Sequence, residues 1–278
     1  AFTFAGSVNI ECDVLEDTDT VVMHAHELEV QSATCASLLT SGGAVPATIS
    51  LDEKSQQLTL TFPAPLNKGA VNFQIEFTGI LNDKMAGFYR STYKGADGSQ
   101  KVMATTQFEA TDARRAFPCW DEPGFKATFD MTVVVADPAL ACLSNMPVKA
   151  RTQDPETNAV TYEYFRSPVM STYLLAFIIG ELESITGRTR GGTEVNVYTT
   201  PGKVSAAVFQ CFCLFVFIFH KILTHIIMLT LFIYLPPPPA FPFRPLIDQP
   251  SSFRLGHGRK GSRLFHRLHG HRFPLAKV

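Results

Sequence analysis

The segment Val71–Ile80 reads VNFQIEFTGI and indicates the fold class of this chain. Its apolar residues occupy every second position from Val71 to Phe77, and polar residues occupy the positions between them. A period of two places the apolar side chains on one face of a β-strand and the polar ones on the other. This pattern is typical of an antiparallel sheet with one buried and one solvated face.

Similar short alternating segments, separated by turn residues, fill the chain from Phe2 to Thr200, and a helical period is almost absent. The loop Gly95–Ser99 has the composition of a hairpin turn. Many short strands at this spacing predict an all-β fold, either an antiparallel β-sandwich or a large curved sheet. The expected strands are 4–14, 20–30, 48–51, 57–62, 71–80, 88–93, 101–106, 127–135, 160–165, 174–183 and 194–199.

Composition divides the chain of 278 residues into two unlike parts. Residues 1–203 carry 15 Lys and Arg against 24 Asp and Glu, whereas residues 204–278 carry 9 against 1. The net charge of −1 excludes a nucleic-acid binder driven by gross charge, and 46% hydrophobic residues exclude disorder throughout. Six cysteines without a C-x-x-C pair do not form a disulfide scaffold. We expect a β-domain over 1–203 and a separate tail over 204–278.

The tail has three sections: an apolar run at 204–235, four prolines at 236–239 and a basic Gly/Arg/His-rich run at 240–278. The apolar run is long enough for a membrane span, but His220 and Lys221 interrupt its middle. One hypothesis is a membrane anchor; the other is an irregular, poorly packed tail that arose from a retained intron or a gene-model error. No basic and apolar leader precedes Ala1, so the expected compartment is the cytoplasm.

One stretch interrupts the strand pattern. Thr106–Lys126 reads TQFEATDARRAFPCWDEPGFK and contains the single Trp of the chain. Asp112 is a candidate N-cap for one helical turn, and Pro118 and Pro123 would end any helix. The charged residues of this stretch are expected to pair with one another: Arg114, Arg115, Asp121 and Glu122.

This stretch, together with Gly87–Ser91, Pro168–Phe177 and Val197–Lys203, resembles the N-terminal domain of zinc metallo-aminopeptidases of the aminopeptidase N family. The resemblance is closest to the puromycin-sensitive branch and covers residues 1 to about 203. It implies a saddle-shaped, all-β domain that covers the active site of the domain that follows. Phe273–Val278 also resembles a family segment just upstream of the catalytic domain.

The resemblance implies two substrate-binding residues. Glu109 matches the acidic residue that binds the free N-terminal amine of a peptide, and Gln107 matches a residue that lines the first specificity pocket. A carboxylate is suited to this role because it forms charge-assisted hydrogen bonds with a cationic amine. The alternative for Glu109 is an ordinary solvated carboxylate. We interpret Asp121 and Glu122 as residues that hold the turn, and Cys119 as a buried apolar residue.

The catalytic zinc motif of the family, H-E-x-x-H, does not occur in this sequence. His26-Glu27 begins correctly, but Val30 stands where the second histidine is required. We therefore predict no catalytic residue, no metal ligand and no cofactor in this chain, with zinc confined to the full-length family. The predicted function is that of a truncated aminopeptidase N-terminal domain that is inactive alone and binds peptide N-termini weakly. The alternative is a non-catalytic β-module that binds partners or peptide N-termini, tethered to a membrane through 204–235.

Overall fold

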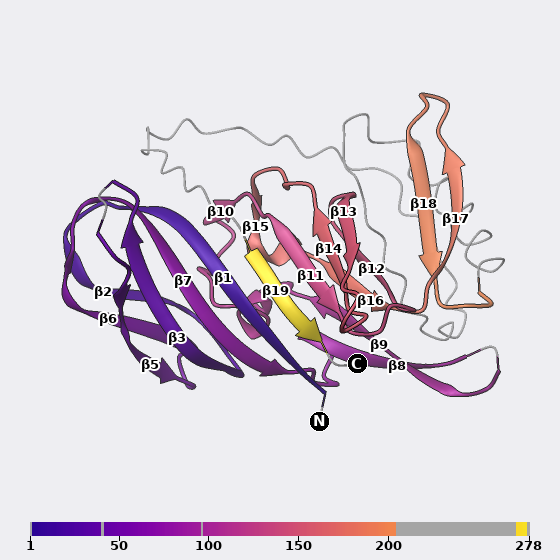
Figure 1. The fold of residues 1–278 in the computed structure, drawn as a ribbon, viewed down its shortest axis with the longest axis horizontal. Helices are drawn as coiled ribbons and strands as arrows, with labels where there is room; N and C mark the ends of the chain where they lie inside the picture. Colours follow the sequence, from indigo (N-terminus) through magenta and orange to yellow (C-terminus); the bar gives the residue numbers. More distant parts are fainter. Residues whose placement is uncertain (1, 40–41, 96, 204–270, 277–278) are drawn as a thin grey trace, which may run out of the picture.

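The computed structural model describes residues 2–39, 42–95, 97–203 and 271–276, and Figure 1 shows the arrangement of their strands. Within these residues the regular elements are β-strands, apart from two single-turn 3-10 helices, η1 (Ala113–Arg115) and η2 (Thr172–Leu174). The all-β fold class predicted from the alternating segments is confirmed.

The largest sheet has eight strands and runs through the centre of the view in Figure 1. Its strand order is β13-β14-β11-β19-β1-β7-β3-β4, and every pairing in it is antiparallel except that of β11 with β19. The strands are β1 (Thr3–Val14), β3 (Leu28–Ser37), β4 (Val45–Pro46), β7 (Gly69–Ile80), β11 (Met131–Val135), β13 (Val148–Gln153), β14 (Val160–Tyr164) and β19 (His271–Ala276).

Strand β7 shows the alternation that the sequence predicts. Val71, Phe73, Ile75 and Phe77 are buried, whereas Glu76 is exposed. Each buried apolar side chain of this size stabilises the fold by about 1.5–3 kcal/mol relative to an exposed one. β7 pairs with β1 without a register shift over twelve residue pairs. A slip of one residue would turn the whole apolar face toward solvent, so this face fixes the register.

Two smaller sheets supply the opposite side of the core. A three-stranded sheet contains β2 (Thr18–His24), β5 (Thr48–Asp52) and β6 (Gln57–Leu66), and a four-stranded sheet contains β8 (Gly87–Lys94), β9 (Gln100–Gln107), β12 (Ala141–Ser144) and β16 (Phe177–Gly180). The ring of Phe88 on β8 lies 5.1 Å from that of Phe4 on β1 and 4.7 Å from that of Phe177 on β16. These rings join the large sheet and the four-stranded sheet in one apolar cluster.

Two short pairs complete the strands: β10 (Lys126–Ala127) with β15 (Met170–Ser171), and β17 (Glu183–Arg188) with β18 (Glu194–Thr199). The hairpin predicted between β8 and β9 is confirmed, since the N–H of Gly95 donates to the carbonyl of Ser99 at 2.8 Å. Gly98 has φ +79° there, a conformation that glycine adopts without a steric penalty.

Three segments that were predicted as single strands are each divided between two or more elements in the structure. The segment 20–30 divides into β2 and β3 because the chain changes partners at Ala25–Glu27, where Glu27 has φ 55°. The segment 127–135 divides into β10 and β11, and the segment 174–183 contains the end of η2, all of β16 and the first residue of β17. Strands β12 and β13 were not expected, because one is only four residues long and the other is an edge strand that is mostly exposed.

The tail differs from the expected irregular structure at His271–Ala276. These residues form β19, which lies between β1 and β11 and joins the two parts of the eight-stranded sheet (Figure 1). The backbone pairing satisfies strand edges that β1 and β11 would otherwise leave open. Pro274 has no N–H to donate, and the pairing of β19 with β11 is irregular beside it, between Phe273 and Ala276.

The apolar run at 204–235, the prolines at 236–239 and the basic run up to residue 270 lie outside the described residues. The division at residue 203 therefore stays a prediction. Within the described part of the chain, no helix combines the length and apolar character that crossing a membrane requires.

Candidate functional site

The segment Thr106–Lys126, which interrupts the strand pattern and is called the motif below, runs from the end of β9 to the start of β10. Buried aromatic side chains fix its position. Phe108 follows the last residue of β9 and is 2% exposed. Its ring lies 6.1 Å from that of Phe117 in the same segment and 6.5 Å from that of Phe177 on β16. The N–H of Asp112 donates to the carbonyl of Phe108 at 2.9 Å and closes a turn. The backbone between these anchors is therefore held against the core.

Gln107 and Glu109 flank Phe108, and the side chains of both are exposed. Gln107 is the last residue of β9 and pairs with Gly87 of β8. Glu109 lies at the start of the following turn, and its peptide bond to Ala110 is cis. Within the described residues, the Glu109 carboxylate has no hydrogen-bond or ion-pair partner. The sequence predicted these two positions, and the structure brings them to one strand end with an unpaired carboxylate between fixed neighbours.

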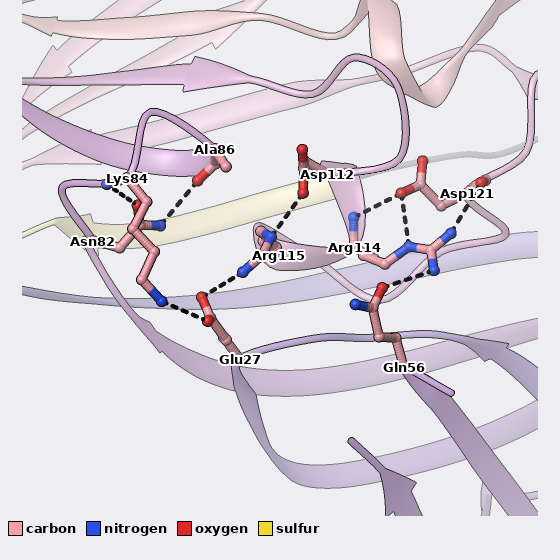
Figure 2. Close-up of polar contacts among 9 residues, drawn as sticks. All are labelled: Glu27, Gln56, Asn82, Lys84, Ala86, Asp112, Arg114, Arg115 and Asp121. Carbon is pink, nitrogen blue, oxygen red and sulfur yellow. Dashed lines mark hydrogen bonds and ion pairs between the residues drawn. The ribbon is translucent and has the colours of Figure 1, made fainter. Parts of the chain in front are cut away.

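A buried ion pair lies at the C-terminal end of the motif (Figure 2). The carboxylate of Asp121, 1% exposed, accepts hydrogen bonds from the backbone N–H of Arg114 at 3.2 Å and from its Nε at 3.1 Å. Thr172 donates its hydroxyl to the second carboxylate oxygen at 2.9 Å. Arg114 Nη1 donates to Gln56 Oε1 at 3.1 Å. Both charges of the pair are thus neutralised and hydrogen-bonded, as burial requires.

A second ion-pair network lies on the other side of η1 (Figure 2). Arg115 Nε donates to Asp112 at 2.7 Å, and its Nη1 lies 2.6 Å from Glu27. Lys84 Nζ donates to the other oxygen of Glu27 at 3.1 Å. Burial raises the pKa of the Glu27 carboxyl, but hydrogen bonds from Arg115 and Lys84 outweigh burial and leave this pKa below its usual value. Glu27 stays ionised at neutral pH and fixes the turn after Glu109 to the loop between β2 and β3.

The expected pairing of the charged motif residues is confirmed for Arg114 with Asp121 and is wrong for the others. Arg115 pairs with Asp112 and Glu27 instead, and Glu122 is exposed without an ion pair in the described part of the chain. Asp112 precedes η1 as expected, but its side chain makes no capping hydrogen bond. Its carboxylate is already engaged by Arg115, which explains why it does not cap the helix.

Cys119 is buried, as predicted. It is 4% exposed, and burial raises the pKa of its thiol well above the ordinary value. A thiol in this environment is not a nucleophile at neutral pH.

Four residues that hold the motif were not found by sequence reasoning: His24, Glu27, Gln56 and Thr172. They come from segments 51 to 97 residues away from their partners. The sequence offers no signal for His24 and Gln56, and Thr172 lies in Pro168–Phe177, which was noted only for its resemblance to the family. The fourth, Glu27, was noticed only as part of an incomplete zinc motif.

The described residues do not fit a zinc ion. They contain no group of three or more His, Cys, Asp or Glu side chains that is arranged to hold a metal. His26-Glu27 lies in the break between β2 and β3, and the Glu27 carboxylate is occupied by Arg115 and Lys84. His220 and His225, whose spacing of five residues does not suit a helical metal motif, and the histidines at 266, 269 and 271 have no described side chains, so the structure does not test them as metal ligands.

Comparison with known proteins agrees with this fold and motif. The Peptidase M1 N-terminal domain family matches residues 1–174, and the chain belongs to this family. It is 46% identical over 206 residues to the puromycin-sensitive aminopeptidase of Caenorhabditis elegans, an alignment that covers 73% of this chain and 21% of that protein. It is 42% identical over 212 residues to aminopeptidase M1 of Arabidopsis thaliana, covering 75% of this chain and 24% of that protein. A third relative, aminopeptidase 2 of Candida albicans, is 42% identical over 203 residues, or 72% of this chain and 21% of that protein.

The resemblance to metallo-aminopeptidases is therefore confirmed. The chain spans about a fifth to a quarter of the length of these relatives. The full-length family is zinc-dependent, but the described residues of this chain contain no group that would hold the metal.

Proposed function

We propose that this domain supplies the substrate-amine recognition edge of an aminopeptidase that removes N-terminal residues from peptides. In this proposal the Glu109 carboxylate binds the cationic N-terminal amine, and Gln107 lines the pocket for the first side chain. Hydrolysis by a zinc-activated water is not assigned to the described residues, because they offer neither a base in a metal motif nor a set of metal ligands.

The unpaired state of Glu109 is the observation that carries the proposal. Eight ion pairs occur among the described residues, and Glu109 takes part in none of them. Its backbone is nevertheless fixed, since Phe108 before it is buried and Asp112 after it is ion-paired. A positioned carboxylate with free acceptor sites suits a ligand that brings its own cation and N–H donors.

Binding to this edge alone is expected to be weak. A charge-assisted hydrogen bond contributes about 1.5–3 kcal/mol when it is well shielded and less at an exposed surface. Association costs at least about 4 kcal/mol in translational and rotational freedom. Glu109 is exposed, so one such contact does not offset this cost, and we expect a dissociation constant that is millimolar or too weak to detect.

A titration with two peptides tests the role of Glu109. A short peptide with a free N-terminus and its N-acetylated counterpart are added to the ¹⁵N-labelled chain, and amide shifts are followed by NMR. We expect millimolar binding of the free-amine peptide, with shifts around Gln107–Thr111, and no binding of the acetylated peptide. Glu109→Gln should abolish the difference between the peptides, whereas Glu122→Gln, which removes another unpaired carboxylate of the same motif, should preserve it.

Equal shifts with both peptides, or binding that survives Glu109→Gln, would contradict the assigned role. Micromolar affinity for the free amine, abolished by Glu109→Gln, would favour the alternative function, a non-catalytic module that binds peptide N-termini without a catalytic domain.

The proposed compartment is the cytoplasm. Support comes from Cys12, Cys35, Cys119 and Cys142, which are all free thiols, as is usual in a reducing compartment.

A further inference from the structure

The end of β2 and the motif are joined by several hydrogen bonds between segments far apart in the sequence. The backbone of His24 exchanges two hydrogen bonds with that of Cys119, at 2.8 and 3.1 Å, in an isolated antiparallel bridge. The indole Nε1 of Trp120 donates to the carbonyl of Val22 at 2.9 Å. Trp120 is the single tryptophan of the chain, so it reports directly on this junction.

A side chain of β2 contributes to the same junction. The backbone N–H of Asp121 donates to Nδ1 of His24 at 3.2 Å. An imidazole nitrogen accepts a hydrogen bond only when it carries no proton. The contact therefore requires neutral His24, with its proton on Nε2. If Nδ1 gained a proton, two donors would face each other and the contact would be lost.

The surroundings of His24 favour the neutral form. His24 is half-buried between Met23 and Ala25, which are both buried. The charged groups that face its ring are Arg114, Asp121 and Glu122. Burial, and then the positive charge of Arg114, lower the pKa of His24 below its ordinary value, and the two carboxylates oppose this shift only in part. The Asp121 carboxylate is already occupied by Arg114 and Thr172.

We propose that His24 is an acid-sensitive latch that holds the motif segment Arg114–Asp121 against the end of β2. When His24 is neutral, its Nδ1 accepts a hydrogen bond from the Asp121 N–H, and the Trp120 indole keeps its hydrogen bond to the carbonyl of Val22. Protonation of Nδ1 removes the acceptor and adds a positive charge next to Arg114, so the segment around Trp120 separates from β2. This proposal does not depend on any role of Glu109.

The direction of the pH effect follows from the lowered pKa. When the latch is open, His24 is solvated and titrates near 6.5, whereas the closed latch binds its proton only at lower pH. The open state therefore binds more protons between these two values, and closing is less favourable as the pH falls through this window. The population of the open state rises by about tenfold for each pH unit within the window.

Tryptophan emission during an acid titration of the whole chain tests the latch. We expect a red shift of Trp120 emission as the pH falls from 7.5 to 5, with a midpoint below 6.5, while the far-UV circular dichroism remains native. His24→Asn should abolish the shift, because its Oδ1 keeps an acceptor near the position of Nδ1 but does not titrate. His26→Asn is the matched control: the pKa of His26 is also lowered by burial and by Arg115, but its Nδ1 accepts no hydrogen bond. This variant should retain the shift.

An unchanged emission in the wild-type chain, or a shift that persists in His24→Asn, would overturn the proposal. Hydrogen exchange in the wild-type chain provides a second measurement if His24→Asn does not fold. After correction for the intrinsic exchange rate, protection of the Asp121 amide should fall as the pH decreases below about 6.5, by up to about tenfold per pH unit within the window, while protection of the Phe73 amide in β7 stays constant. Equal changes at both amides would show that acid loosens the whole domain and that no latch exists.

Discussion

Replacing Asp121 with alanine is expected to lower the free energy of unfolding by about 3–5 kcal/mol, because it leaves the buried Arg114 guanidinium without its counter-ion. The Arg114 side chain is 11% exposed and that of Asp121 is 1% exposed, so solvent cannot replace the lost carboxylate. The same change removes the acceptor for the Thr172 hydroxyl. Urea denaturation followed by far-UV circular dichroism measures the loss.

The matched control for this prediction is Asp83→Ala, which also removes an aspartate paired with an arginine. Asp83 lies 3.0 Å from Arg90, but its side chain is 70% exposed. Solvent screens such a pair, and its removal should cost about 0–1 kcal/mol. If both variants lose the same stability, the Arg114–Asp121 pair does not organise the motif as we describe.

Replacing Phe88 with alanine is expected to cost a similar amount, about 3–5 kcal/mol, for a different reason. Phe88 is 4% exposed, and its ring contacts Phe4 of the large sheet and Phe177 of the four-stranded sheet. The truncation removes apolar surface from the core and leaves a cavity between the two sheets, which both destabilise the fold. The same denaturation experiment measures this loss.

Phe165→Ala is the control for this change, since it removes the same side chain from a position that is 51% exposed. Its effect should stay within about 0.5 kcal/mol. A large loss at Phe165 together with a small loss at Phe88 would show that the apolar cluster between the sheets is not the core of the domain.

The fold could be predicted from the sequence where one face of a strand is buried. In β7 the apolar positions from Val71 to Phe77 define both the strand and the face that packs inward. The break between β2 and β3 could not be predicted, because it depends on bonds to Gln56 and Cys119, which are remote in the sequence. The edge strand β13 was missed for a related reason: it is mostly exposed and so lacks an apolar pattern.

The candidate site was predictable only in part. The motif drew attention to Gln107 and Glu109 because it resembles a known family, and the pairing of Arg114 with Asp121 followed from opposite charges in one turn. The roles of Glu27 and His24 could not be predicted. Glu27 meets Arg115 and His24 meets Asp121 only after the strands have folded. Residues that stabilise a loop from a remote part of the sequence show no local sequence pattern from which this role could be predicted.

Our central proposal is that this chain presents the amine-recognition edge of an aminopeptidase and does not itself catalyse hydrolysis. Turnover of an aminoacyl arylamide by the purified chain, with added zinc and with or without a chelator, tests this claim most directly. We predict no turnover above the buffer rate under either condition, because the sequence contains no H-E-x-x-H motif and the described residues hold no group of metal ligands. Chelator-sensitive release of the arylamine at a rate typical of enzymes would contradict it.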